Sequence, residues 1–331
     1  MSARPVISVI LTGGASAAGR RQCRDWFAHG VPAIEILEPP RHGTVAAQRN
    51  AMLQQARAAV VLFWDAAWRP HATLIPYLRE RHASQTAAGD AVLVHAAPGV
   101  GVRNSTLARW YLRQGPWPAR PPLGGVYSWT CFRAPGLSVR RELFAHGHFD
   151  EAFETGDDAE LAARLQARVP VRVWFEPFPL ASIEAVPPTA LALRDAFLDG
   201  YFRRLRWMRG PGVRDLRDLE RVHVDPDQFA RTDKAVADAW TTAVGLEASF
   251  EGVELSFVDK AGADRLQILF EAYDLLFSAA IANGHRQALA GGPPALPDAW
   301  TAWLIAPPGP AARRRGERTT PARSRGSRAR S

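Results

Sequence analysis

Cysteine and long apolar runs are both scarce in this chain of 331 residues. The two cysteines, Cys23 and Cys131, are far apart and form no C-x-x-C pair, which predicts reduced thiols rather than a disulfide framework or a zinc site. No stretch approaches the roughly 20 apolar residues of a membrane-spanning helix. The apolar run that opens the chain is too short for a signal peptide. We therefore expect a cytoplasmic protein.

Motifs of several common nucleotide and metal sites are also missing. Gly13-Gly14 follows the first apolar run, but it is not part of a G-x-G-x-x-G fingerprint, and no G-K-S or G-K-T loop occurs. These absences argue against a dinucleotide-binding fold and against a P-loop. The histidines form no H-E-x-x-H array, which argues against a zinc protease.

Lysine is nearly absent, and the positive charge is concentrated at the end of the chain. Only Lys234 and Lys260 occur, and the net charge is +8. Residues 313–331 hold eight arginines and one glutamate, so they carry +7 and leave about +1 for the rest (8 − 7). We expect residues 306–331 to be a disordered basic tail. The tail lacks interleaved aromatic residues, so we expect solvated charge rather than specific nucleic-acid binding, the alternative reading.

An alternation of β-branched runs and helix-forming runs dominates the first part of the chain. Runs typical of buried strands occupy 6–11, 33–37 and 60–64, and helix-forming runs occupy 16–29 and 44–58. This rhythm predicts an α/β domain with a mostly parallel sheet and flanking helices over residues 1–185. Residues 98–135 are rich in Gly, Pro and Trp and predict long loops around short elements.

The second part of the chain has a helical pattern. Residues 189–209 predict an amphipathic helix with arginines on its polar sides, and residues 225–304 are mainly helical with strand-like pieces near 249–257. We expect a helical region over 186–305. The arginines of 189–209 would face solvent or, as an alternative, anionic lipid at the inner face of a membrane.

Acidic residues stand where a ligand would bind an open α/β sheet. Asp65 ends the third strand, at the carboxyl edge where such sheets hold ligands. Five more acids gather on two neighbouring segments: Asp150, Glu151, Asp157, Asp158 and Glu160. A carboxylate at either place could bind a metal ion or act as a general base. The alternatives are a turn-forming Asp at 65 and acids that merely favour a helix N-terminus.

Four motifs in this order resemble those of family 2 glycosyltransferases with the GT-A fold. They are, along the chain, the Gly43–Leu53 run with Arg49-Asn50, the Phe63–Pro70 run, Arg140-Arg141 with Gly147–Phe153, and Asp157–Leu165. The resemblance covers residues 5–185 and implies an inverting transfer of a sugar from a nucleotide-diphosphate donor to a hydroxyl acceptor. The acceptor would be a saccharide, a lipid-linked molecule or another hydroxyl compound.

The resemblance implies roles for the residues of these motifs. Asp158 would be the catalytic base, and Asp65 would lie at the ribose or at a divalent cation, Mn²⁺ or Mg²⁺. Arg49 and Asn50 would line the donor pocket. The residues expected to support the site are Asp157, Glu160, Asp150 and Glu151. Five tryptophans in or beside the expected cleft could form a sugar platform or simply pack: Trp64, Trp68, Trp110, Trp117 and Trp129.

The chain departs from the family pattern at the cation and at the nucleotide base. Ala67 stands where the last acid of the family's D-x-D motif would ligate the metal. Glu184 falls near the family's metal-binding His and could offer an oxygen instead. Two family elements before the Gly43–Leu53 run are missing, and Glu38 is the acid nearest to the base-binding position. The alternative to an active transferase is therefore a pseudo-enzyme that binds sugars, nucleotides or a partner protein.

Overall fold

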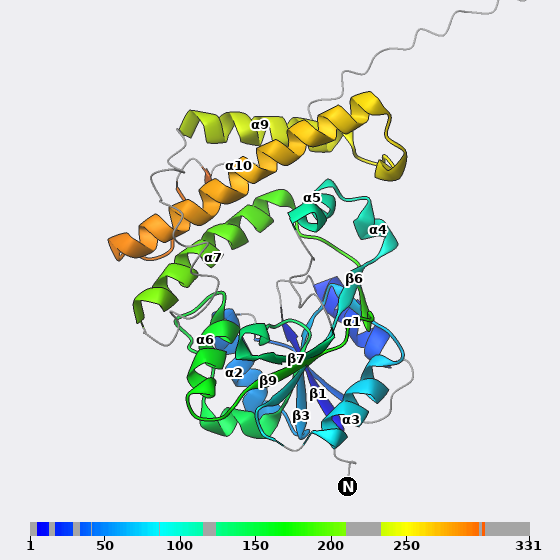
Figure 1. The fold of residues 1–331 in the computed structure, drawn as a ribbon, viewed down its shortest axis with the longest axis vertical. Helices are drawn as coiled ribbons and strands as arrows, with labels where there is room; N and C mark the ends of the chain where they lie inside the picture. The colour runs from blue at the N-terminus through cyan, green and yellow to red at the C-terminus, as the bar shows by residue number, and fades with distance from the viewer. Residues whose placement is uncertain are drawn as a thin grey trace, which may run out of the picture.

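The computed structural model describes residues 5–12, 17–28, 34–40, 42–85, 87–114, 124–209, 233–297 and 300–301. The basic tail expected at 306–331 and Trp117 lie outside these ranges. In Figure 1 the sheet and its helices occupy the lower part of the molecule, and a set of long helices lies above them.

A seven-stranded mixed sheet forms the centre of the first part of the chain. Its order is β2 (Ile34–Leu37), β1 (Ile7–Thr12), β3 (Val60–Asp65), β8 (Leu137–Arg140), β5 (Asp90–Leu93), β9 (Arg172–Phe175) and β7 (Gly125–Ser128). Strands β8 and β7 are antiparallel to their neighbours, and the other strands share one direction. The predicted α/β class with a mostly parallel sheet is confirmed.

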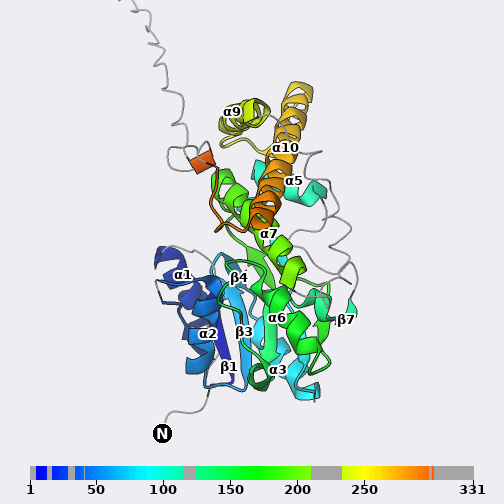
Figure 2. The same ribbon diagram turned by 90° about the vertical axis from the view of Figure 1, so that its left-hand side faces the viewer.

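Four helices cover the two faces of this sheet, which lie to the left and right of the strands in Figure 1, and Figure 2 gives the same elements after a turn of 90°. Helices α1 (Ala17–Ala28) and α3 (Leu74–Ser84) pack on one face, and α2 (Val45–Gln55) and α6 (Asp157–Gln166) on the other. Successive residues of β3 point to opposite faces because strand side chains alternate. Both faces are covered, so almost every residue of the strand is apolar.

A second, three-stranded sheet was not predicted from the sequence. It consists of β4 (Trp68–Pro70), β10 (Ala181–Ile183) and β6 (Ala96–Pro98), with β10 in the middle. These strands are too short to show a period in the sequence. The pairing of β4 with β10 brings the turn after β3 close to Glu184. The Glu184 N–H donates to the Ala67 carbonyl at 2.9 Å.

The helical region is built on two long helices. Helix α7 (Thr189–Arg209) packs along α10 (Lys260–Ala290), and α9 (Asp233–Ser249) packs on α10 (Figure 1). A Cβ on Gly200 or Gly284 would overlap backbone atoms of the facing helix, so glycine permits this close crossing. The predicted helix over 189–209 and the helical C-terminal region are confirmed.

One expectation about an irregular segment is wrong, the strand-like pieces near 249–257. The described part of residues 98–135 contains short elements, as predicted: α4 (Val100–Arg103), α5 (Thr106–Gln114) and the 3₁₀ helix η1 (Trp129–Cys131), besides β7. Residues 249–257 contain the 3₁₀ helix η4 (Leu255–Phe257), and no described residue there is in a strand. Helix α5 joins the helical region because the rings of Trp110 and Phe277 stack with centroids 4.4 Å apart.

The tryptophans expected near the cleft are mostly core residues. Trp64, Trp68 and Trp110 are buried, and Trp129 is partly buried against the core. Trp64, Trp68 and Trp110 therefore serve packing rather than a sugar platform. None of the helices in the described ranges is both long and apolar enough to cross a bilayer.

Candidate functional site

Asp65 ends β3 and is fixed by its own turn. The Ala67 N–H donates to Asp65 Oδ1 at 2.8 Å, which is the usual way an Asp starts a turn. The alternative reading of Asp65 as a turn residue therefore holds, and it leaves Oδ2 available to a ligand. Burial raises the pKa of Asp65, although the Ala67 N–H opposes this. A neighbouring cation or hydroxyl would offset that burial.

Asp158 is held at the same edge of the sheet, beside the end of β3. Its Oδ2 accepts the Ala134 N–H at 2.7 Å, and its side chain is almost fully buried. Ala134 lies just before β8, which is antiparallel to β3. The start of β8 and the end of β3 therefore share one edge, and a backbone bond from Gly136 N–H to Phe63 O at 2.8 Å ties them there. Asp65 thus ends β3, and Asp158, in the first turn of α6, is bonded to the segment that leads into the adjacent strand β8.

Asp157, next to Asp158 in the chain, forms a buried ion pair with Arg49. Arg49 Nη1 lies 2.7 Å from its Oδ1 and 2.6 Å from its Oδ2. The Arg49 guanidinium also lies over the rings of Phe149 and Phe63, at 5.3 and 5.9 Å from their centroids. Burial raises the pKa of Asp157, Arg49 lowers it, and Asp158 raises it further. Both charges of the pair are thus already neutralised by each other.

Asn50 joins two of the sequence motifs. Its Nδ2 donates to the Phe149 carbonyl and to Glu151 Oε1, each at 2.9 Å, and its Oδ1 accepts the Phe149 N–H at 3.1 Å. Thr44, which caps α2, donates to the Glu151 carbonyl at 3.1 Å. The structure therefore uses Asn50 and Glu151 to hold the turn before α6 against the start of α2.

Glu160 and Asp150 are engaged in local contacts. Glu160 pairs with Arg164 one turn further along α6, at 2.5 Å between Oε1 and Nε. Asp150 Oδ1 accepts the Ala152 N–H at 3.0 Å and shapes the turn. Both contacts are consistent with the expected supporting role.

Glu38 lies beside α1. Its carboxylate pairs with Arg24 at 3.1 Å and with Arg20 at 3.8 Å. Burial, then Asp65, then Glu38 raise the pKa of Cys23 to about 12. The electrostatic influence of both acids on one thiol means that Glu38 and Asp65 lie near the same part of α1. The thiol of Cys23 stays neutral and packs as an apolar side chain.

The residues at this edge do not form a metal site by themselves. No group of three or more His, Cys, Asp or Glu side chains that could hold an ion occurs among the described residues. Ala67 has no ligating atom, and the exposed carboxylate of Glu184 is brought near only by the backbone bond to Ala67. A cation here would need oxygens from another molecule, as Mg²⁺ does when it is held by one or two carboxylates and substrate phosphates.

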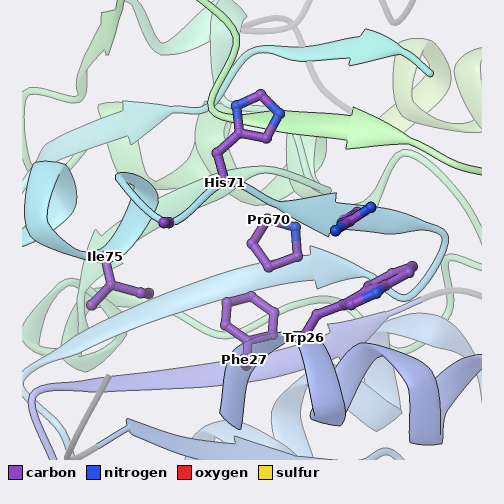
Figure 3. A pocket seen from close by; sticks show the side chains of 7 residues that line it. Trp26, Phe27, Pro70, His71 and Ile75 are labelled. Carbon is purple, nitrogen blue, oxygen red and sulfur yellow. The ribbon is translucent and has the colours of Figure 1, made fainter. Parts of the chain in front are cut away.

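A cavity of about 400 Å³ lies between α1, β4 and the start of α3. Figure 3 shows Phe27 and Trp26 below Pro70, His71 above it and Ile75 to the left. The lining includes neither Asp65 nor Asp158. We place the candidate site by the strand ends rather than by this cavity, because ligands of open α/β sheets bind at the carboxyl edge.

Sequence reasoning missed Arg206 of α7. The helical pattern put its guanidinium on a polar, outward side, but it is only 5% exposed, and its Nη1 donates to the Gly156 carbonyl at 2.7 Å. The lipid-facing alternative for the arginines of 189–209 therefore does not apply to Arg206. The local signal for this contact was Gly156, because a glycine just before a helix often has a positive φ that other residues disfavour.

Comparisons with known proteins gave structural similarity only. No protein-family model matches the chain, and no curated protein matches it. The chain is similar in structure to glycosyltransferases of the GT-A type. One is TarS of S. aureus, residues 1–349 in complex with UDP-GlcNAc, at 10% identity and a TM-score of 0.45, with 86% of this chain and 92% of that chain covered.

Two further structures belong to the same type. Mannosyltransferase PcManGT from Pyrobaculum calidifontis, in complex with GDP-Man and Mn²⁺, is 16% identical, with a TM-score of 0.47 and coverage of 88% of this chain and 89% of that chain. GalNAc-T7 with UDP, GalNAc and Mn²⁺ is 9% identical, with a TM-score of 0.37 and coverage of 61% and 51%. The ligands are those of the named proteins.

Proposed function

We propose that this protein is a glycosyltransferase that moves a sugar from a nucleotide-diphosphate donor to a hydroxyl acceptor with inversion at the anomeric carbon. The proposal starts from the four family-like motifs of the sequence. The observation that carries it is the position of Asp158: its carboxylate is fixed by the Ala134 N–H at the strand end next to Asp65.

The motif residues support this site by their contacts with one another. Arg49 and Asn50 come from one motif, and Asp157, Phe149 and Glu151 come from two others. Their hydrogen bonds fasten the segment that carries Asp158 to helix α2, which packs on the sheet. A base must be held in a fixed position to accept a proton in the transition state, because misplacement by about 1 Å can cost 100-fold in rate.

The chemistry needs one base and one leaving group. Asp158 would accept the proton of the acceptor hydroxyl, whose oxygen forms the new bond to the anomeric carbon. The bond from that carbon to the donor phosphate breaks on the opposite side, and its electron pair leaves with the nucleoside diphosphate. The proposed donor contacts are Asp65, Arg49, Asn50 and Glu38, although Arg49 reaches the donor only with the part of its guanidinium that Asp157 does not use.

A divalent cation stays a proposal for the donor diphosphate. Asp65 and Glu184 are the carboxylates that it would meet. The protein residues alone do not fit a complete site, so no step is derived through it. Association with a membrane and a lipid-linked acceptor are likewise proposals.

A pseudo-enzyme is the second candidate, and Ala67 is the observation that favours it. Such a protein would bind a nucleotide sugar, a glycan or a partner through the same edge without turnover. Binding and turnover therefore have to be measured separately.

The first experiment is thermal unfolding of the full chain with UDP-, GDP- and dTDP-sugars, each with and without Mn²⁺. A ligand that binds the native state raises the unfolding midpoint by mass action. A shift with one nucleotide, followed by release of the nucleoside diphosphate in the presence of an acceptor, supports the transferase. A shift without turnover supports the pseudo-enzyme, and the absence of any shift contradicts both donor-binding readings.

Asp158→Asn tests the base in the same assays. We expect the donor-induced shift to persist and turnover to fall by on the order of 100-fold or more, the range of general-base contributions. Asp264→Asn is the matched control, because Asp264 is an exposed carboxylate on α10, far along the chain from the motifs. Equal turnover in both variants would remove Asp158 from the mechanism.

A further inference from the structure

The buried guanidinium of Arg206 meets the first peptide of α6. Its Nη1 donates at 2.7 Å to the carbonyl of Gly156, the residue immediately before Asp157 and Asp158. The same carbonyl accepts the Glu160 N–H at 3.2 Å, the first backbone bond of α6. Arg206 therefore holds the group that sets the direction of the helix start.

The backbone at Gly156 leaves no room for a side chain. Its φ is +67°, in the left-handed region that favours glycine. A Cβ at this position would also overlap with Arg206 Nη1. The absence of a side chain at Gly156 therefore allows Arg206 to approach the backbone this closely.

Helix α7 is itself firmly seated, so Arg206 is a fixed support. Phe202 packs on Phe153 with ring centroids 5.5 Å apart, and both side chains are buried. The hydroxyl of Tyr201 donates to the Gly292 carbonyl at 2.8 Å. The crossing of α7 and α10 at Gly200 and Gly284 fixes the helix further along.

The charges around Arg206 include the proposed base. Burial lowers the pKa of Arg206, Asp199 and then Asp158 raise it, and Arg133 and Arg203 lower it. An arginine keeps its charge even when buried, because its ordinary pKa is above 12. The guanidinium of Arg206 is thus a permanent positive charge near the Asp158 carboxylate.

We propose that Arg206 is a positioning residue for Asp158, and that it couples the helical region to the active edge of the sheet. It acts through the Gly156 carbonyl, which orients the first turn of α6. The helical region is then part of the catalytic apparatus rather than an appended module. The catalytic part of this proposal rests on the proposed function.

The first test compares Arg206→Met and Arg206→Lys with wild-type protein in turnover assays. We expect Arg206→Met to lower kcat by about 10- to 100-fold, with the donor KM changed less than about 3-fold. Arg206→Lys should restore part of kcat, because its ammonium group is still a hydrogen-bond donor. Arg194→Met, an exposed arginine of the same helix, is the control and should change neither kcat nor the donor KM.

A second test measures the contact without relying on turnover. Gly156→Ala should lower the unfolding midpoint in the wild-type background, and by clearly less when Arg206 is also changed to alanine. Left-handed strain remains in the double variant, but the overlap with Nη1 is gone. Equal effects in both backgrounds would contradict the contact.

The two tests distinguish a failure of the positioning role from a failure of the proposed function. If the wild-type protein turns over and Arg206→Met has an unchanged kcat, the positioning role alone is overturned. No turnover in wild-type protein with any donor overturns the proposed function and the positioning role with it, while the non-additive stability still reports the contact. If Arg206→Met fails to fold at assay temperature, Arg206→Lys decides: a lower kcat at an unchanged donor KM supports the positioning role, and an unchanged kcat overturns it.

Discussion

Arg49 Nη1 lies within 2.7 Å of both carboxylate oxygens of Asp157, although the two residues are 108 positions apart in the chain. Both side chains are buried, so little water is available to solvate one charge if the other is removed. The pair therefore fixes α2 against α6, and it leaves Asp158 to accept the backbone N–H groups of Ala134 and Ala159.

Removal of one partner of this pair should be strongly destabilising. We expect Arg49→Met or Asp157→Asn to lower the free energy of unfolding by about 3–5 kcal/mol, because each leaves a buried charge uncompensated. Chemical denaturation measures the loss. The double variant should cost less than the sum of the two. Additive losses would mean that the pair is not coupled.

Introduction of an acid at position 67 should create metal dependence. In Ala67→Asp a second carboxylate joins Asp65, so we expect donor binding to become about tenfold tighter with Mn²⁺, close to 1.4 kcal/mol. The readout is the donor-induced thermal shift with and without Mn²⁺. Ala67→Asn is the control of equal size. A wild-type protein that already needs Mn²⁺ as strongly as Ala67→Asp does would show that other oxygens complete the site.

The glycines of the helix crossing should not tolerate a methyl group. Gly200→Ala or Gly284→Ala is expected to cost roughly 1–3 kcal/mol of stability, because a Cβ at either place meets backbone of the other helix. Gly245→Ala in α9 is the matched control, since a Cβ there meets nothing within 4 Å. That variant should gain up to about 1 kcal/mol from helix propensity. Equal effects at the three positions would contradict the close crossing.

Acid should weaken the fold through His82. Burial, and then the nearby Arg140, lower its pKa from 6.5 to about 4, while its Nε2 lies 2.8 Å from Ser138 Oγ. Between these values the unfolded chain binds the proton and the folded chain does not, so stability falls as pH drops from 6.5 toward 4. The group contributes on the order of 3 kcal/mol to this loss.

The measurement is the unfolding free energy against pH. His82→Gln should flatten the slope in this window, and His146→Gln, at an exposed position, should leave it unchanged. His285, whose pKa burial and then Arg203 and Arg204 also lower to about 4, should retain its own part of the slope. An unchanged slope in His82→Gln would mean that the folded protein accepts the proton there.

Local sequence was sufficient to place the main elements. The run at 60–64 predicted β3 because a strand covered on both faces must be apolar throughout, and Asp65 marked its end. The amphipathic repeat predicted α7 from 189 to 209 because helix periodicity persists over its length. The strands β4, β6 and β10 were missed, since three residues of extended chain show no period and depend on partners far along the chain.

The sequence by itself determined which acids follow the strands and open the helix, because composition and period are local properties. Only the tertiary structure decided what each acid does. It paired Asp157 with Arg49 and Glu38 with Arg24, and it left Asp158 on a backbone N–H at the edge beside Asp65. It also turned Arg206 inward to Gly156. The physical reason is that ion pairs and burial depend on which elements approach each other, and no local pattern records that approach.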